Sequence, residues 1–261
     1  MTFLGGHRVI FSNRGIEIAP NNYKSSSGLI CFAHRGASGH EPENTLLSVE
    51  KAISLGAQWI EIDVYAVEDE LVVIHDETLE RTTNGKGFVA NRSLEYLRSL
   101  DAGKGQKIPL LKEVFNLVDN RAGINVELKG PNTASPVTAL IHEYIKNHNL
   151  TFDRIIVSSF NHDELKKVKA FQPDINIGVL ISSIPEHFVR VAENVGAYSV
   201  HISKRSVNKQ FVDDAHERGI KVFVYTVNSG EDVALMQSLG VDGIFTDYPE
   251  ILSLPGSQSR A

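Results

Sequence analysis

The sequence contains only one cysteine, Cys31, which excludes an internal disulfide bond. Cys31 lies in an apolar run, where a cysteine usually serves as a small buried side chain. A cysteine content this low agrees with a cytoplasmic location. The chain also lacks any apolar run of about 18 residues, so we expect no membrane-spanning helix and no stable membrane anchor. Its first residues do not combine an apolar segment with a small-residue cleavage site, and we expect no signal peptide.

Basic residues are scarce relative to acidic ones. The chain has 26 Lys and Arg residues against 32 Asp and Glu residues, a formal net charge of −6. Proteins that bind the phosphate backbone usually present a basic surface, so nucleic acid is not an expected partner. Disorder is excluded as well, because 42% of the residues are hydrophobic and only 22% are charged. The composition is that of a globular protein, and no feature of it indicates an oligomeric state.

Two parts of different character make up the chain. Residues 1–28 contain short apolar pieces and a serine-rich connector, and we predict a hairpin followed by a loop for this N-terminal extension. Residues 29–261 show a regular alternation with no interior linker, which predicts one domain. Their number suits an α/β barrel, because such barrels reach about 250 residues as a single domain.

Short runs rich in Val and Ile alternate with stretches of helical period. The predicted strands are 29–34, 58–65, 71–75, 122–128, 154–159, 175–181, 197–202, 220–226 and 242–246. The predicted helices are 45–55, 136–147, 163–171, 185–195, 207–218 and 230–239. Several of these helices end just before a glycine, the residue that enters the left-handed region most easily.

Repeated strand–helix units predict parallel strands joined by right-handed crossovers. The stretch between 58–65 and 71–75 is too short for a crossover helix, so these two strands must form a hairpin. Without the extra hairpin strand, eight remain, as in a TIM (β/α)8 barrel. A doubly wound open sheet is the competing architecture, but the first strand ends in Ala33-His34-Arg35-Gly36 rather than in a glycine-rich phosphate loop.

Acidic side chains gather where predicted strands end. Glu61 and Asp63 are two residues apart on one strand, so they point to the same side. Glu127 and Lys129 repeat this spacing on another strand. Three converging carboxylates would suit Mg²⁺ or Ca²⁺, whereas zinc is less favoured because the usual Cys/His spacing is missing. The alternative is a set of unrelated rim charges, or salt bridges such as one between Glu127 and Arg35.

Two histidines, His34 and His75, follow strands in the same region. A histidine can give or take a proton near neutral pH, so the pair suits one general acid and one general base. Arg35 has the planar fork that matches phosphate oxygens, and Lys129 adds a point charge. The other histidines are expected to be structural, with His201 the least certain because it lies within a predicted strand.

At these residues the sequence resembles the glycerophosphodiester phosphodiesterase family. The resemblance rests on blocks that run in order from about residue 30 to 250 and are specific together: His34-Arg35-Gly36, Pro42-Glu43-Asn44-Thr45, Glu61-Ile62-Asp63-Val64, Val73-Ile74-His75-Asp76-Glu77-Thr78, Arg81-Thr82-Thr83, Glu127-Leu128-Lys129, Ser158-Ser159-Phe160, Tyr225-Thr226-Val227-Asn228 and Thr246-Asp247-Tyr248-Pro249. The family often has Trp where this chain has Tyr225. Residues 1–28 are not covered.

The resemblance implies a TIM barrel with an extra hairpin strand and an inserted segment, about 76–108, over the barrel mouth. It implies metal-dependent hydrolysis of glycerophosphodiesters to sn-glycerol 3-phosphate and an alcohol, with either water or the substrate's own 2-hydroxyl as attacking oxygen. The implied roles fall into three groups: metal ligands Glu61, Asp63 and Glu127, the acid–base pair His34 and His75, and the substrate-binding residues Arg35, Lys129, Phe160 and Tyr225.

Two further functions fit the same residues. A lysophospholipase D would act on a lipid, and an apolar surface on the inserted segment would distinguish it; the candidates there are Phe88, Val89, Leu94, Tyr96 and Leu97. A barrel that only binds sugar phosphates is the other, and the intact set of histidines and carboxylates argues against it. Asn44 or Thr45 is predicted to cap the first helix. Glu43 either shares that region without a role or orients Arg35 or the metal site.

Overall fold

The computed structural model describes residues 28–185 and 188–253, and the predicted N-terminal extension therefore lies almost wholly outside the described residues. A nine-stranded sheet runs in the order β1-β9-β8-β7-β6-β5-β4-β2-β3, and pairing of β1 with β2 closes eight parallel strands into a barrel. The strands are β1 (Ile30–His34), β2 (Trp59–Val67), β3 (Glu70–Val73), β4 (Gly123–Leu128), β5 (Ile155–Ser159), β6 (Asn176–Ile181), β7 (Ser199–Ser203), β8 (Lys221–Tyr225) and β9 (Gly243–Thr246). The predicted TIM barrel and all nine predicted strands are confirmed.

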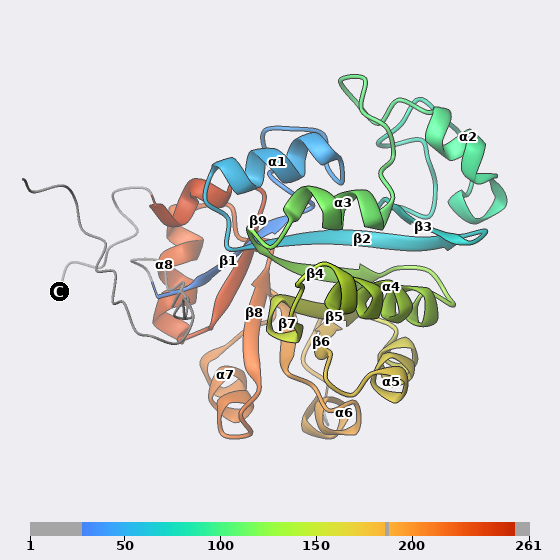
Figure 1. The fold of residues 1–261 in the computed structure, drawn as a ribbon. Helices are drawn as coiled ribbons and strands as arrows, with labels where there is room; N and C mark the ends of the chain where they lie inside the picture. The colour runs from blue at the N-terminus through green and yellow to red at the C-terminus, as the bar shows by residue number, and fades with distance from the viewer. Residues whose placement is uncertain (1–27, 186–187, 254–261) are drawn as a thin grey trace, which may run out of the picture.

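Helices surround the barrel as a ring, with α1 and α3 on one side and α6 and α7 on the opposite side (Figure 1). They are α1 (Leu46–Ser54), α2 (Leu94–Ser99), α3 (Leu111–Val118), α4 (Ala134–Asn147), α5 (His162–Phe171), α6 (Phe188–Asn194), α7 (Lys209–His216) and α8 (Gly230–Leu239). Six correspond to predicted helices, whereas α2 and α3 were not predicted. Among the described residues, no helix is both long and apolar enough to cross a bilayer.

The hydrophobic core has an outer and an inner part. The outer part fills the space between the barrel and its helices, where alternate strand residues such as Ile60, Val126 and Val157 are fully buried. The inner part is a small aromatic cluster inside the barrel, built on Phe32, Phe223 and Phe245. Their ring centroids lie 4.7 Å apart for both Phe32–Phe223 and Phe32–Phe245. These rings close the barrel interior, so only its carboxyl end is left for a site.

The extra strand arises because β2 is longer than its barrel neighbours. β2 pairs with β4 only as far as Val64, and beyond that point it pairs with β3, from Val64 with Val73 to Val67 with Glu70. The hairpin turn is therefore tighter than the five residues predicted from the sequence, because pairing leaves only Glu68 and Asp69 between the strands. β3 then returns to the barrel end, and the Ile74 amide donates a 3.0 Å hydrogen bond to the Asp63 carbonyl.

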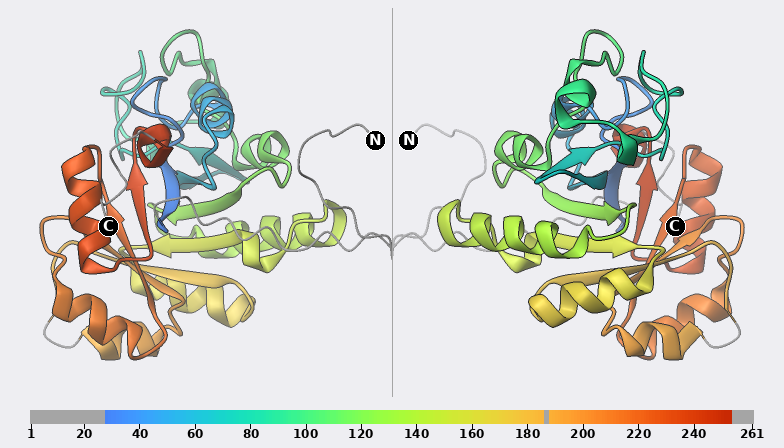
Figure 2. Two further views of the ribbon diagram at one scale, coloured as in Figure 1. Left: turned by 90° about the vertical axis from the view of Figure 1, so that its left-hand side faces the viewer. Right: turned by 90° about the vertical axis from the view of Figure 1, so that its right-hand side faces the viewer.

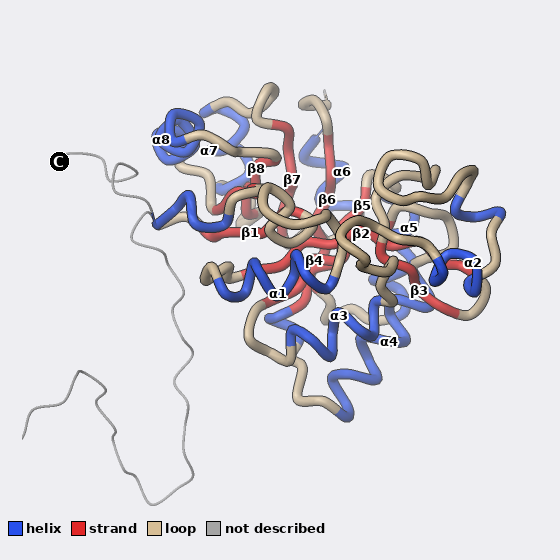
Figure 3. Tube along the Cα trace, turned by 90° about the horizontal axis from the view of Figure 1, so that it is seen from above, coloured by secondary structure: helices blue, strands red, loops and turns tan. Residues whose placement is uncertain are grey.

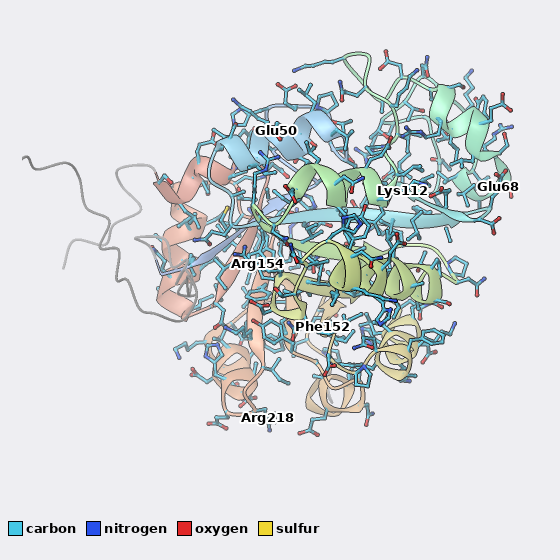
Figure 4. The ribbon with its side chains drawn as sticks, in the orientation of Figure 1. Glu50, Glu68, Lys112, Phe152, Arg154 and Arg218 are labelled. Atoms are coloured by element: carbon cyan, nitrogen blue, oxygen red, sulfur yellow. The ribbon has the colours of Figure 1, made fainter. Side chains whose placement is uncertain are left out.

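The inserted segment after β3 packs on the β2–β3 hairpin in a second hydrophobic cluster, in which Leu79, Val89 and Leu97 are fully buried together with Val72 of β3. α2 lies next to the β2–β3 hairpin and is joined to it by long loops (Figure 3). At the hairpin tip, beside α2, the Glu68 carboxylate accepts a hydrogen bond from the Leu94 amide (Figure 4). On its other side the segment contacts the loop before α1, near which it lies in both views of Figure 2, through an ion pair between Lys104 and Glu41.

Candidate active site

A pocket of about 130 Å³ opens at the carboxyl ends of the barrel strands. All the barrel strands line it, and β3 is followed by one more lining residue. The lining residues are His34, Arg35, Glu61, His75, Asn125, Glu127, Lys129, Ser158, Phe160, Leu180, His201, Tyr225, Thr226 and Phe245. Eight of the nine residues to which the sequence analysis gave a role are in this set. The ninth, Asp63, lies directly behind it and is 1% exposed.

Three buried carboxylates meet at one side of the pocket. Strand pairing places Glu61 opposite His34 on β1, and Asp63 opposite Glu127 on β4. One oxygen from each of Glu61, Asp63 and Glu127 lies within 4.8 Å of the other two. The geometry therefore brings together the three residues that the sequence predicted as ligands.

Burial and mutual repulsion shift the pKa values of these carboxyl groups. Burial, with the negative charges of Asp63 and Glu127, raises the pKa of Glu61 well above its ordinary value. Burial, with the charge of Asp63, raises the pKa of Glu127 to about 7. Although burial opposes it, the positive charges of Lys129 and Arg35 hold the pKa of Asp63 below its ordinary value. Such a cluster is stabilised by additional positive charge.

The donor set fits a divalent metal ion. Glu61 Oε1 is buried and has no hydrogen-bond partner within the described part of the chain, and Asp63 Oδ1 has none either, although the Lys129 ammonium lies 3.3 Å from it. Buried carboxylate oxygens in this state are costly unless a cation binds them. Carboxylate oxygens are also the ligands that hard cations prefer. Glu61, Asp63 and Glu127 could therefore hold such an ion.

The two predicted phosphate-binding cations already contact these acids. The Lys129 ammonium lies 2.6 Å from Glu127 Oε1 and 3.3 Å from Asp63 Oδ1. The Arg35 guanidinium lies 3.4 Å from Asp63 Oδ2 through Nε and donates a 2.7 Å bond to Glu43 through Nη1. The salt bridge considered from the sequence, between Glu127 and Arg35, does not form in the structure. Glu127 pairs with Lys129 instead. Both cations line the pocket, so a bound anion would find them beside the carboxylates.

Each of the two histidines is held by an aspartate through the same ring atom. His34 Nδ1 lies 2.7 Å from Asp247 Oδ1, and His75 Nδ1 lies 2.6 Å from Asp76 Oδ1. Nδ1–H bonded to a carboxylate leaves Nε2 as the atom that exchanges a proton. Both rings line the pocket, so the arrangement supplies two oriented proton-transfer groups beside the carboxylates of β2.

The environments of the two pairs differ. Although burial would raise it, the hydrogen bonds from His34, Ser38 and Asn228 lower the pKa of Asp247 to about 2. Burial, with the positive charges of Arg35 and Lys129, lowers the pKa of His75, which favours the neutral ring near pH 7.

The loop between β1 and α1 supplies three residues with separate roles. Thr45 caps α1 by accepting a hydrogen bond from the Ser48 amide. Of the two residues predicted as the cap, Thr45 is therefore confirmed. Asn44 does not cap the helix; its Nδ2 donates a 2.8 Å bond to Asp63 Oδ2. Glu43 accepts from Arg35, which agrees with the prediction that it orients that arginine.

An arginine of the inserted segment joins the two halves of the site. Arg81 donates to both oxygens of Asp76 at 2.6 and 2.8 Å, and to both oxygens of Glu43 at 2.7 and 2.8 Å. Asp76 in turn holds His75, and Glu43 holds Arg35. Arg81 is therefore a positioning residue for one imidazole and one guanidinium.

Aromatic side chains form one wall of the pocket. Phe160 is 49% exposed and meets Tyr225 edge to face, with ring centroids 6.2 Å apart. The Tyr225 hydroxyl donates a 2.8 Å hydrogen bond to the Ile181 carbonyl, which fixes the ring. The structure thus places both predicted substrate-binding aromatics at the pocket.

Sequence reasoning gave no role to Asp247, although it quoted this residue in the block Thr246-Asp247-Tyr248-Pro249, and it gave none to the side chains at the pocket base. Asp247 comes directly after β9, so the rule that polar residues at strand ends form the site could have identified it. Asn125 and Ser158 lie within β4 and β5, and the block Ser158-Ser159-Phe160 is the sequence signal that points to Ser158. His201 was expected to be structural, and it is fully buried but also lines the pocket.

Comparison with known proteins gives the family. The model of the glycerophosphoryl diester phosphodiesterase family matches residues 34–251. A glycerophosphodiester phosphodiesterase of Caldanaerobacter subterraneus subsp. tengcongensis is 40% identical over 233 residues, 85% of this chain and 96% of the relative. One from Bacillus altitudinis is 38% identical, covering 84% of this chain and 94% of the relative. A phosphodiesterase of Oleispira antarctica, solved with the product sn-glycerol-3-phosphate, has a TM-score of 0.78 at 33% identity, covering 86% of this chain and 95% of that one.

Proposed function

The chain belongs to the glycerophosphoryl diester phosphodiesterase family, and from this premise we propose that it hydrolyses soluble glycerophosphodiesters, such as glycerophosphocholine and glycerophosphoethanolamine, to sn-glycerol 3-phosphate and an alcohol. The observation that carries the proposal is the meeting of three buried carboxylates with two aspartate-held histidines in one pocket. This set contains a cation site and both proton-transfer groups that the cleavage of a phosphodiester requires.

A phosphodiester resists attack because its own negative charge repels the incoming oxygen. Arg35 and Lys129 would bind the non-bridging oxygens and neutralise part of that charge. Glu61, Asp63 and Glu127 would hold Mg²⁺ or Ca²⁺, which when bound supplies further charge neutralisation at the phosphate.

The two histidines would handle the protons. One Nε2 would accept the proton of the attacking oxygen, and the other would donate a proton to the departing alkoxide. The lowered pKa of His75 suits it to start as the base, which makes His34 the acid. Asp76 and Asp247 keep each Nε2 directed to the pocket and stabilise the ring once it is protonated.

The lysophospholipase D alternative receives little support from the inserted segment. Among its five apolar candidates, Val89 and Leu97 are fully buried and Leu94 packs on the same core. Only Phe88 and Tyr96 are exposed, at 51% and 36%. The apolar residues of the segment are therefore mostly used to fold the segment itself, which leaves a small area for a lipid chain.

The decisive experiment measures release of sn-glycerol 3-phosphate from glycerophosphocholine and glycerophosphoethanolamine, with Mg²⁺, with Ca²⁺ and with a chelator. We expect metal-dependent release from both diesters, and loss of release in His34→Ala and in His75→Ala while each variant keeps its fold by circular dichroism. An active His34→Ala protein would contradict the mechanism, and no release from folded protein with either metal would contradict the function. A cytoplasmic location, which the cysteine content favours, belongs to the same proposal.

A further inference from the structure

A histidine outside the pocket joins the two loops that surround the His34–Asp247 pair. His40 lies in the loop between β1 and α1, and Glu250 lies in the 3₁₀ helix η3 (Pro249–Ser253), which follows β9. His40 Nε2 lies 2.7 Å from Glu250 Oε1. Neither side chain belongs to the pocket lining. The contact therefore links the loop after β1 to the turn after β9 from outside the pocket.

A second contact joins the same two loops. The His40 ring meets the Tyr248 ring edge to face, with centroids 5.5 Å apart. Gly39 makes this approach possible, because a Cβ atom at that position would collide with the Tyr248 ring. The Gly39 amide also donates a 2.9 Å hydrogen bond to the Asp247 carbonyl. The loop before α1 thus holds the turn from Asp247 to Glu250 at its first residue, in its middle and at its last residue.

This turn begins with the residue that orients His34. Asp247 Oδ1 lies 2.7 Å from His34 Nδ1 and 2.9 Å from Ser38 Oγ, which belongs to the same loop as His40. Ser38 Oγ also lies 2.8 Å from the His34 carbonyl oxygen. A misplacement of about 1 Å in a reacting group can cost about 100-fold in rate. The place of the Asp247 main chain therefore matters to proton transfer at His34.

The pair between His40 and Glu250 has little to offer stability. Its two side chains are 34% and 30% exposed, and an ion pair this accessible to water contributes little to the free energy of unfolding. Glu250 Oε2 is buried and has no hydrogen-bond partner in the described part of the chain, which is unfavourable for a carboxylate. Positioning of the turn is therefore the main effect that these contacts can have.

We propose that His40 and Glu250 form a positioning pair, which fixes the turn carrying Asp247 and so orients the His34 imidazole toward the leaving-group oxygen. The inference deepens the proposed function and rests on it, because it takes His34 as the general acid. Both members of the pair lie outside the pocket lining. Their loss should slow proton donation and leave substrate binding unchanged.

The test compares two leaving groups, using the full-length protein with its metal. Glycerophosphocholine releases an alkoxide, which needs a proton to depart. The 4-nitrophenyl ester of sn-glycerol 3-phosphate releases a stabilised phenolate, which departs without one. We expect His40→Ala to lower kcat by about tenfold for glycerophosphocholine and by no more than about twofold for the nitrophenyl ester, with KM unchanged for both. A merely structural loss would slow both substrates alike.

Further variants define the pair. Glu250→Ala should give the same selective loss, and the double variant should lose no more than either single variant, because the two side chains act as one unit. His40→Gln should recover at least about half of the wild-type kcat, since a glutamine amide can also donate to Glu250. The matched control is His216→Ala, which breaks a comparable 2.8 Å pair with Asp242 away from the pocket. The control should keep both rates within about twofold of the wild-type values.

The outcomes separate the positioning pair from the function. Wild-type rates in His40→Ala, or equal losses on the two substrates, would overturn the pair and leave the hydrolase intact. Absence of cleavage of either diester by the wild-type protein would overturn both proposals. If His40→Ala does not fold, Glu250→Ala decides by the same comparison, since its Oε2 has no hydrogen bond to lose among the described residues.

Discussion

Replacing Asp247 by Asn tests how the chain orients the His34 imidazole, to which we assign the role of general acid. Asp247 Oδ1 lies 2.7 Å from His34 Nδ1 and also accepts from Ser38 Oγ at 2.9 Å, while Oδ2 accepts from Asn228. An asparagine keeps the shape but loses the charge, and its amide nitrogen can face His34 as a donor. The His34 ring, which we propose as the acid, would then lose the negative charge that stabilises its protonated form, and it would donate a proton from Nε2 less readily.

The magnitude of the effect follows from the pKa and from related chemistry. The pKa of Asp247 is lowered from 3.8 to about 2, and each unit is worth about 1.4 kcal/mol, so its partners stabilise the folded state by about 2 kcal/mol at most near neutral pH. Because the folded pKa is below the unfolded one, this stability is present above about pH 4 and is lost as the pH falls towards 2. An Asp-to-Asn change behind a catalytic histidine lowers kcat by up to about 10⁴-fold in serine proteases. We expect a fall of about 10²- to 10⁴-fold here.

The assay measures kcat and KM for glycerophosphocholine together with urea unfolding from pH 7 to pH 3. The matched control is Asp242→Asn, because Asp242 forms a comparable ion pair with His216, at 2.8 Å, away from the pocket. We expect Asp242→Asn to lose stability but keep kcat within about threefold. The reasoning fails if Asp247→Asn keeps wild-type kcat, or if both variants lose activity in proportion to their loss of stability.

Three further predictions concern the rest of the site. Arg81→Gln should lower kcat/KM by about 10- to 100-fold, since it frees both carboxylates that hold His75 and Arg35. The control Arg98→Gln breaks the bidentate pair between Arg98 of the same segment and Glu113, and it should leave kcat/KM unchanged. Equal losses in the two variants would contradict the role of Arg81. Mg²⁺ or Ca²⁺ should raise the melting temperature of the wild-type protein, and a chelator should reverse the shift. Glu61→Gln should abolish that shift together with activity, and a persisting shift in calorimetry would place the ion elsewhere.

The barrel strands could be predicted because each is a short, apolar, β-branched run between turn residues. Helix α3 could not be predicted from the sequence, because it lacks the polar cap residue and the terminal glycine that usually mark the two ends of a helix. Its N-cap residue is Leu110, whose side chain makes no capping hydrogen bond, and its C-cap is Asp119 in the left-handed conformation rather than a glycine. The hairpin turn was also misjudged, because its residues Glu68 and Asp69 do not carry the glycine or asparagine that marks a tight turn.

The site residues divide in the same way. Glu61, Asp63, His34 and Glu127 were identifiable because polar residues at strand ends meet on one face of a barrel. The residues that hold these side chains in place were not identifiable, because they come next to them only in the folded chain. Asp247 is 213 residues away from the histidine that it holds, and only closure of the barrel brings β9 beside β1. The role of Asn44 as a donor to Asp63, in place of the predicted cap, likewise requires the folded loop.

The overhang of β2 beyond the barrel rim also bears on how such a molecule can diverge. His75 follows the point where β3 rejoins the barrel, and its place is set by the pairing of the hairpin and by the bond from Ile74 to Asp63. Residues 82–108 do not line the pocket, but Leu97, Leu100 and Ile108 belong to one hydrophobic cluster with Ile74, the neighbour of His75. We therefore expect activity to tolerate substitutions and grafts at the exposed positions between residues 82 and 108, provided that this cluster is kept. The exposed face of the segment is then the place where the protein's outer contacts can change while the pocket lining stays the same.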